Sequence, residues 1–133
     1  MIKKSEKIKK IAERLIANDT DLAEIKEEGV KIVYLLSDIE KTQNRKVVFG
    51  DCTKVAERYR WCCPYDFMIT IYEPNVVNYG LNAKQKRALV KHELLHVGID
   101  YSGNEPSYYV APHDIEDFRA VINEYGLEWS VKG

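Results

Sequence analysis

The stretch Lys91-His92-Glu93-Leu94-Leu95-His96-Val97 carries the pattern H-E-x-x-H within a run that favours helix, and the rest of the chain is interpreted around it. Residues four apart on a helix lie about one turn apart on nearly the same face, so His92 and His96 can direct both imidazoles at one ion. Glu93 projects beside that pair, where a carboxylate can polarise a water molecule without binding the metal itself. Zinc hydrolases use this spacing, and Zn²⁺ is therefore the cofactor that we expect.

The composition is that of one soluble globular domain of 133 residues. Apolar residues make up 45% of the chain and charged residues 31%, which is enough for one core and gives no sign of disorder. The formal charge of −1 and the pI near 6.3 argue against a nucleic-acid binder driven by bulk electrostatics. A local basic patch stays open as an alternative.

No segment of the sequence suggests export or membrane insertion. The lysine-rich residues 1–7 are not followed by an apolar run with a small-residue cleavage site, and no run approaches the roughly twenty apolar residues that span a bilayer. Cys52, Cys62 and Cys63 are odd in number and include an adjacent pair, which suits free thiols in a reducing compartment. We therefore expect a cytoplasmic protein with no membrane partner.

Hydrophobic spacing predicts two helices near the N-terminus and strands after them. Apolar residues recur every three or four positions over residues 5–17, which is typical of an amphipathic helix. A second short helix is predicted at residues 21–28, with Gly29 as its C-terminal cap. Short apolar, β-branched runs predict strands at residues 30–36, at 45–49 ending at Gly50-Asp51, and at 66–72, with a short fourth near Val76-Val77. The first two of these strands are expected to pair.

The H-E-x-x-H motif lies in a predicted helix over residues 83–97. Asn82 and Gln85 have the spacing of a capping box, and Gly98 is the first glycine or proline after them. The helix is apolar on two sides, so we expect one side to pack on the sheet and the other to face a cleft. The positions predicted to be solvated are Lys84, Arg87 and Lys91.

The segment after this helix is predicted to return the chain to the cleft. Residues 100–111 are turn-rich and aromatic, with about the length needed to fold back across it. Pro112 suits the first position of a last helix over residues 113–125, which Gly126 ends. The chain is expected to be one domain over residues 1–133, with N-terminal helices in 1–29 and the core in 30–126.

A catalytic zinc site usually takes three protein ligands and leaves a fourth position open. The chain has three histidines, and the third, His113, opens the last predicted helix. We therefore predict His92, His96 and His113 as ligands, with Glu93 as general base and later proton shuttle. A carboxylate of Glu116 or Asp117 can take the place of His113.

Other side chains near the motif are candidates for supporting roles. Asp100 and Asp114 can accept the second ring N–H of a ligating imidazole. The oxyanion of a tetrahedral intermediate also needs a stabilising donor, for which the candidates are Tyr101, Tyr108, Tyr109 and Arg119.

Two segments of the chain resemble a known family. Residues 85–96 (QKRALVKHELLH), followed by 112–118 (PHDIEDF) and 124–126 (EYG), are similar to the putative phage metallopeptidase family of small zincin-like domains from phages and prophages. The resemblance extends as a pattern over residues 30–126. It implies that His92, His96 and His113 bind zinc and that Glu93 acts as the base.

Together, the motif and the resemblance predict an α+β, zincin-like fold. Its parts are a small mixed or antiparallel sheet of three to four strands, a central H-E-x-x-H helix, N-terminal helices, and a C-terminal helix that supplies the third ligand. The predicted reaction is zinc-dependent hydrolysis of a peptide or protein through a metal-activated water, and an extended substrate can pair with an exposed sheet edge.

Two other functions stay open. A zincin fold can bind zinc without turnover and serve as a module for protein interaction, although a purely structural site has no need for Glu93 as a base. The other alternative is a SprT-like protease acting on DNA-associated protein, which the lysines of the first helix favour.

Overall fold

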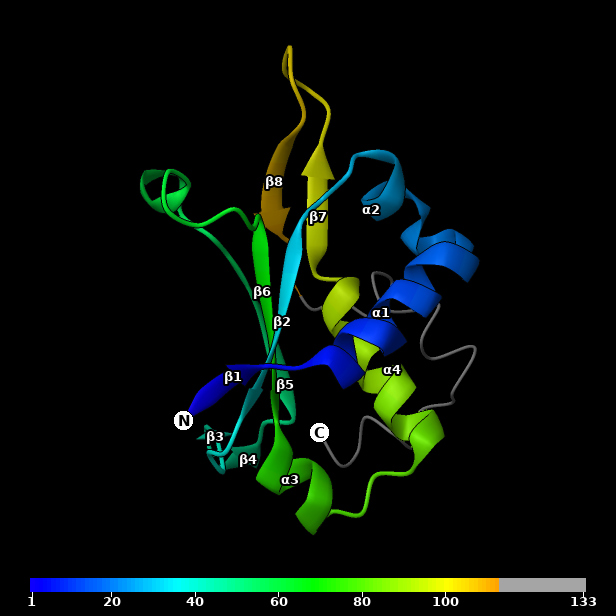
Figure 1. The fold of residues 1–133 in the computed structure, drawn as a ribbon, viewed down its shortest axis with the longest axis vertical. Helices are drawn as coiled ribbons and strands as arrows, with labels where there is room; N and C mark the ends of the chain where they lie inside the picture. The colour runs from blue at the N-terminus through cyan, green and yellow to red at the C-terminus, as the bar shows by residue number, and fades with distance from the viewer. Residues whose placement is uncertain (113–133) are drawn as a thin grey trace.

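The computed structural model describes residues 1–112. Within them, a four-stranded mixed sheet has the order β1-β2-β6-β5, and two smaller two-stranded sheets accompany it. Helices α1 and α4 cover one face of the four-stranded sheet (Figure 1). The prediction of an α+β chain with a small mixed sheet is confirmed. The strands of the main sheet are β1 (Ile2–Lys4), β2 (Ile32–Ser37), β5 (Gly50–Lys54) and β6 (Phe67–Tyr72).

The central strands β2 and β6 run parallel, with Ile32 opposite Phe67 and Ser37 opposite Tyr72. Strands β1 and β5 add to them in the antiparallel sense, so they form the two edges among the described strands. Their central position explains why β2 and β6 are apolar enough to be predicted from the sequence. The short strand β1 was not predicted.

The predicted pairing of the strands at residues 30–36 and 45–49 is wrong. Residues Lys46–Val47 form only a two-residue strand, β4, which pairs with β3 (Thr42–Gln43). Asn44 and Arg45 have φ angles of 52° and 65°, the left-handed conformation that a two-residue hairpin turn requires. The longer strand begins at Gly50, where the sequence predicted an end.

The N-terminal helices agree with the prediction. Helix α1 (Glu6–Asn18) begins after Ser5, whose hydroxyl oxygen accepts the N–H of Ile8 at 3.2 Å. A 3₁₀ turn, η1 (Thr20–Leu22), leads into α2 (Ala23–Glu27). Gly29 follows with a φ of 63°, the left-handed conformation typical of a residue just past a helix end.

The fourth strand predicted near Val76-Val77 is wrong, because these residues lie in α3 (Glu73–Asn78). Pro74 stands in the first turn of this helix, where its missing N–H removes no helical hydrogen bond. Asn75 is buried in the same helix, and its side-chain amide donates to the carbonyl oxygens of Lys41 at 2.9 Å and Val48 at 2.7 Å.

Helix α4 (Ala83–Leu94) has the predicted capping box, in which Asn82 and Gln85 exchange side-chain to backbone hydrogen bonds. The helix ends three residues earlier than predicted. Val97–Asp100 instead forms β7, which pairs with β8 (Ser107–Val110) in a hairpin. Residues 100–111 do turn back on the chain, but as part of this hairpin, which returns Ala111 to His96, where its N–H donates to the His96 carbonyl at 2.7 Å.

The hairpin depends on a close approach at Gly98. A Cβ added there would lie 2.5–2.7 Å from ring atoms of Tyr109, its cross-strand partner. Gly98 was predicted to end the helix, but it lies inside β7, where the missing side chain admits the Tyr109 ring onto the paired strand.

Lys91 was predicted to be solvated and is instead buried, with 1% of its surface exposed. Its ammonium lies 2.7 Å from a carboxylate oxygen of Asp19 and 3.2 Å from one of Asp21. These acids follow α1 and compensate the buried charge, so they connect α4 to the N-terminal helices. None of the helices within residues 1–112 is both long and apolar enough to cross a membrane.

Candidate metal and catalytic site

The end of α4 brings His92 and His96 together. Their ring centroids lie 5.2 Å apart, with the ring planes at 75°. Although the helix ends at Leu94, the backbone continues to turn, because the N–H of Leu95 donates to the Lys91 carbonyl at 3.0 Å and that of His96 to the Glu93 carbonyl at 3.1 Å. This continued turn keeps the two imidazoles side by side, as a metal shared between them requires.

A hydrogen bond defines the tautomer of His96. Its Nδ1 lies 2.6 Å from the carbonyl oxygen of Ala111, and a carbonyl can only accept, so Nδ1 carries the proton. In the neutral ring, Nε2 is then the nitrogen that carries the lone pair. A carbonyl that orients a ligating histidine through its other nitrogen is a common feature of zinc sites.

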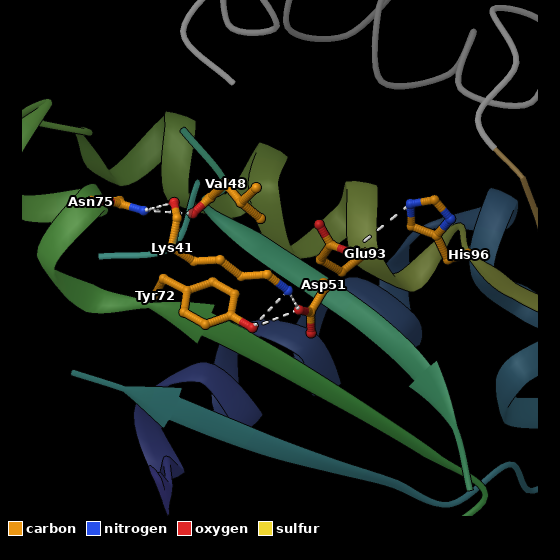
Figure 2. A network of polar contacts seen from close by, with 7 residues as sticks. All are labelled: Lys41, Val48, Asp51, Tyr72, Asn75, Glu93 and His96. Atoms are coloured by element: carbon orange, nitrogen blue, oxygen red, sulfur yellow. Dashed lines mark hydrogen bonds and ion pairs between the residues drawn. The ribbon is translucent and has the colours of Figure 1, made fainter. Parts of the chain in front are cut away.

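Glu93 lies beside the histidines and is 3% exposed. Its Oε1 is 3.9 Å from Nε2 of His96, as Figure 2 shows. The stem of Glu93 packs against β5, where a Cβ added at Gly50 would lie 3.4 Å from its Cγ. The pKa of Glu93 is raised to about 8, mainly by burial and further by the nearby Asp51 carboxylate, while the Lys41 ammonium partly opposes both.

A polar network borders Glu93 on the other side of β5 (Figure 2). The Lys41 ammonium donates to Asp51 at 2.8 Å and to the Tyr72 hydroxyl at 3.3 Å, and that hydroxyl donates to Asp51 at 2.6 Å. The network joins the edge strand β5, the central strand β6 and the segment before β3. Sequence reasoning missed Lys41, Asp51 and Tyr72, because only the strand register brings them together.

The tyrosines proposed for the oxyanion have other contacts. The Tyr101 hydroxyl donates at 3.1 Å to Glu28, the residue that caps the C-terminal end of α2. The Tyr108 ring packs on Phe67 with centroids 5.9 Å apart, and Tyr109 covers Gly98. The carboxylate of Asp100 accepts the backbone N–H of Ser102 at 2.9 Å.

The remaining predicted site residues lie outside the described part of the chain. They are His113, Asp114, Glu116, Asp117 and Arg119.

The described residues fit part of a zinc site. Two imidazoles, one with a defined tautomer, match the nitrogen donors that zinc prefers. Within residues 1–112, no group of three histidine, cysteine, aspartate or glutamate side chains could hold a metal ion.

Comparison with known protein families gives a match over nearly the whole chain. A family model described as "Putative phage metallopeptidase" matches residues 1–132, which is nearly the whole chain. No curated protein and no solved structure matches the chain.

Proposed function

Because the chain belongs to the putative phage metallopeptidase family, we propose that it hydrolyses peptide bonds in a zinc-dependent reaction at the end of α4. The family implies a metal cofactor and a peptide or protein substrate. The observation that carries the finer proposal is the buried Glu93 carboxylate, 3.9 Å from the ring of His96 and next to the paired imidazoles. A structural metal site has no need for a base in that place.

In this proposal, His92 and His96 hold the metal, and His113 supplies the third donor from beyond the described residues. When bound, zinc would polarise the scissile carbonyl and make water acidic enough to be deprotonated near neutral pH. The Ala111 carbonyl keeps His96 in the tautomer whose Nε2 can act as a ligand.

Glu93 moves the proton of the reaction. Its carboxylate takes a proton from the attacking water and later delivers it to the nitrogen of the leaving amine. Packing against β5 at Gly50 holds the side chain in place. Its burial keeps bulk water from competing for the proton.

The edge strand β5 is the proposed binding site for the substrate backbone. Among the described strands of the main sheet, β5 pairs with β6 on one side and with none on the other. An extended peptide can add to such an edge through main-chain hydrogen bonds. Glu93 touches this strand, so a peptide bound there would lie near the base. A mixed sheet with its edge beside the motif helix supports the zincin-like fold.

The test is the substitution Glu93→Gln, with Glu105→Gln in the exposed hairpin as the matched control. Unfolded casein and a peptide library are incubated with zinc-loaded protein, and cleavage is read by mass spectrometry. Glu93→Gln should retain zinc and lose at least about a hundredfold in rate, while Glu105→Gln should match the wild type.

Cleavage that survives in zinc-loaded Glu93→Gln would refute the role of Glu93. A wild type that binds zinc but cleaves no substrate in the library would support the non-catalytic binding module instead.

A further inference from the structure

The loop between β5 and β6, residues 55–66, displays aromatic side chains to solvent; it is termed the β5–β6 loop. Trp61 is 86% exposed and Tyr59 is 50% exposed. Figure 1 shows the loop projecting from the sheet on the side away from α1 and α4. Large aromatic side chains usually bury most of their surface, and exposed ones are characteristic of binding sites.

The β5–β6 loop is held in a defined shape. Arg60 forms an ion pair with the buried Asp66, whose carboxylate also accepts the Lys31 N–H at 2.8 Å. Inside the loop, the Tyr59 carbonyl accepts two backbone N–H groups, at 3.1 and 2.9 Å, from the cysteines that follow Trp61. Trp61 is therefore presented on an ordered turn, and little conformational entropy needs to be lost on binding.

Cations accompany the rings. The Arg58 guanidinium lies 5.0 Å from the centroid of the Tyr59 ring. The Lys4 ammonium lies 5.4 Å from the Tyr65 ring at the other end of the loop. Lys54 and Lys31, both exposed, flank the loop on the adjoining strand and connection.

The acids of the loop balance its arginines but leave the flanking lysines uncompensated. Asp66 is neutralised by Arg60, and Glu57 is the one exposed acid within residues 55–66. Within residues 55–66 the two arginines balance the two acids, so the excess positive charge of this region comes from the flanking Lys4, Lys31 and Lys54, in a chain whose formal charge is −1. This is the local patch that the overall charge left open.

We propose that the β5–β6 loop binds single-stranded nucleic acid. Unpaired bases stack on Trp61 and Tyr59, and the phosphates between them lie against Arg58 and Lys54. Aromatic rings and cationic side chains alternate along the loop, and bases and phosphates alternate along a nucleic-acid strand in the same way. An acidic peptide would use the cations and leave Trp61 without a partner, and a duplex would not offer its base faces.

The experiment measures the fluorescence anisotropy of a fluorescein-labelled thymidine oligonucleotide of about twenty residues, at about 50 mM salt and with a chelator present. The wild type should bind, and Trp61→Ala should weaken binding about tenfold or more. Trp61→Phe should recover most of the affinity, because it keeps an aromatic ring. Arg58→Ala should weaken binding and reduce the salt slope by about one.

The control is Ile39→Ala, which removes an exposed apolar side chain (52% exposed) outside the loop and should bind like the wild type. Failure of the wild type to bind the oligonucleotide would overturn the proposal. So would equal binding by Trp61→Ala, or displacement of the oligonucleotide by polyglutamate at equal charge concentration, which would point to an acidic protein. The chelator keeps the result independent of the proposed peptidase activity.

Discussion

Replacing Lys91 with methionine should destabilise the fold, although an apolar side chain ordinarily suits a buried position. The Lys91 side chain is 2% exposed and lies between two carboxylates, Asp19 at 2.7 Å and Asp21 at 3.2 Å. Methionine preserves most of the buried stem and removes the charge. The two acids then lose their counter-ion and stand close together.

The loss in the free energy of unfolding depends on how exposed to solvent the two remaining carboxylates are. Removing one partner of a buried ion pair costs about 3–5 kcal/mol when the other stays buried. Here the side chain of Asp19 is 16% exposed and that of Asp21 is 46% exposed, so solvent relieves part of the cost. We expect a loss of about 2–3 kcal/mol in the free energy of unfolding. Adding Asp19→Asn to Lys91→Met should recover about 1 kcal/mol, because one unpaired charge is removed.

The assay is urea unfolding followed by far-UV circular dichroism at neutral pH, with metal removed by a chelator. Lys10→Met, at an exposed position of α1, is the matched control and should change the free energy by less than about 0.5 kcal/mol. A loss for Lys91→Met that equals the control would refute the reasoning. Additive losses in the double variant would show that the lysine and Asp19 are not coupled.

Three further predictions concern acid stability, thiol reactivity and the hairpin. Burial raises the pKa of Asp19, but the lysine ammonium and a backbone N–H outweigh it and leave the pKa below its usual value of 3.8. The resulting stabilisation is present above that value and is lost as pH falls through the native pKa, so Asp19→Asn should flatten the fall of the urea midpoint in acid. Burial and, to a smaller extent, nearby carboxylates raise the pKa of the Cys52 thiol to about 12. A thiol reagent at neutral pH should therefore modify the exposed Cys62 rapidly and Cys52 only when the protein unfolds. Equal modification rates for the two thiols would contradict the burial of Cys52. Gly98→Ala should destabilise the fold by about 1–3 kcal/mol in the same urea assay, and adding Tyr109→Ala should relieve part of that loss; no loss would show that the ring does not lie on Gly98.

Features encoded by neighbouring residues could be predicted from the sequence. Helix α1, the capping box of α4 and the central strands β2 and β6 each have a local pattern of spacing or composition. The proximity of His92 and His96 also depends on a single helical turn. The H-E-x-x-H spacing was therefore enough to predict that the two imidazoles lie side by side.

Features that depend on distant partners could not be predicted in this way. Strand β5 has a turn-like sequence beginning Gly50-Asp51, and its conformation comes from pairing with β6. The same pairing brings Asp51 to the Tyr72 hydroxyl, and Lys41 reaches both from the segment before β3. A lysine such as Lys91 ordinarily lies at the surface. Only the position of η1 in the structure brings Asp19 and Asp21 to its ammonium group.

The central claim is that His92 and His96 bind a catalytic metal beside Glu93. Anomalous scattering at the zinc edge, from crystals of protein shown by elemental analysis to contain zinc, tests it most directly. We expect one ion bound to both imidazoles and to one further protein ligand, with a coordination position left open beside Glu93. An ion bound elsewhere, or four protein ligands closing the site, would contradict it.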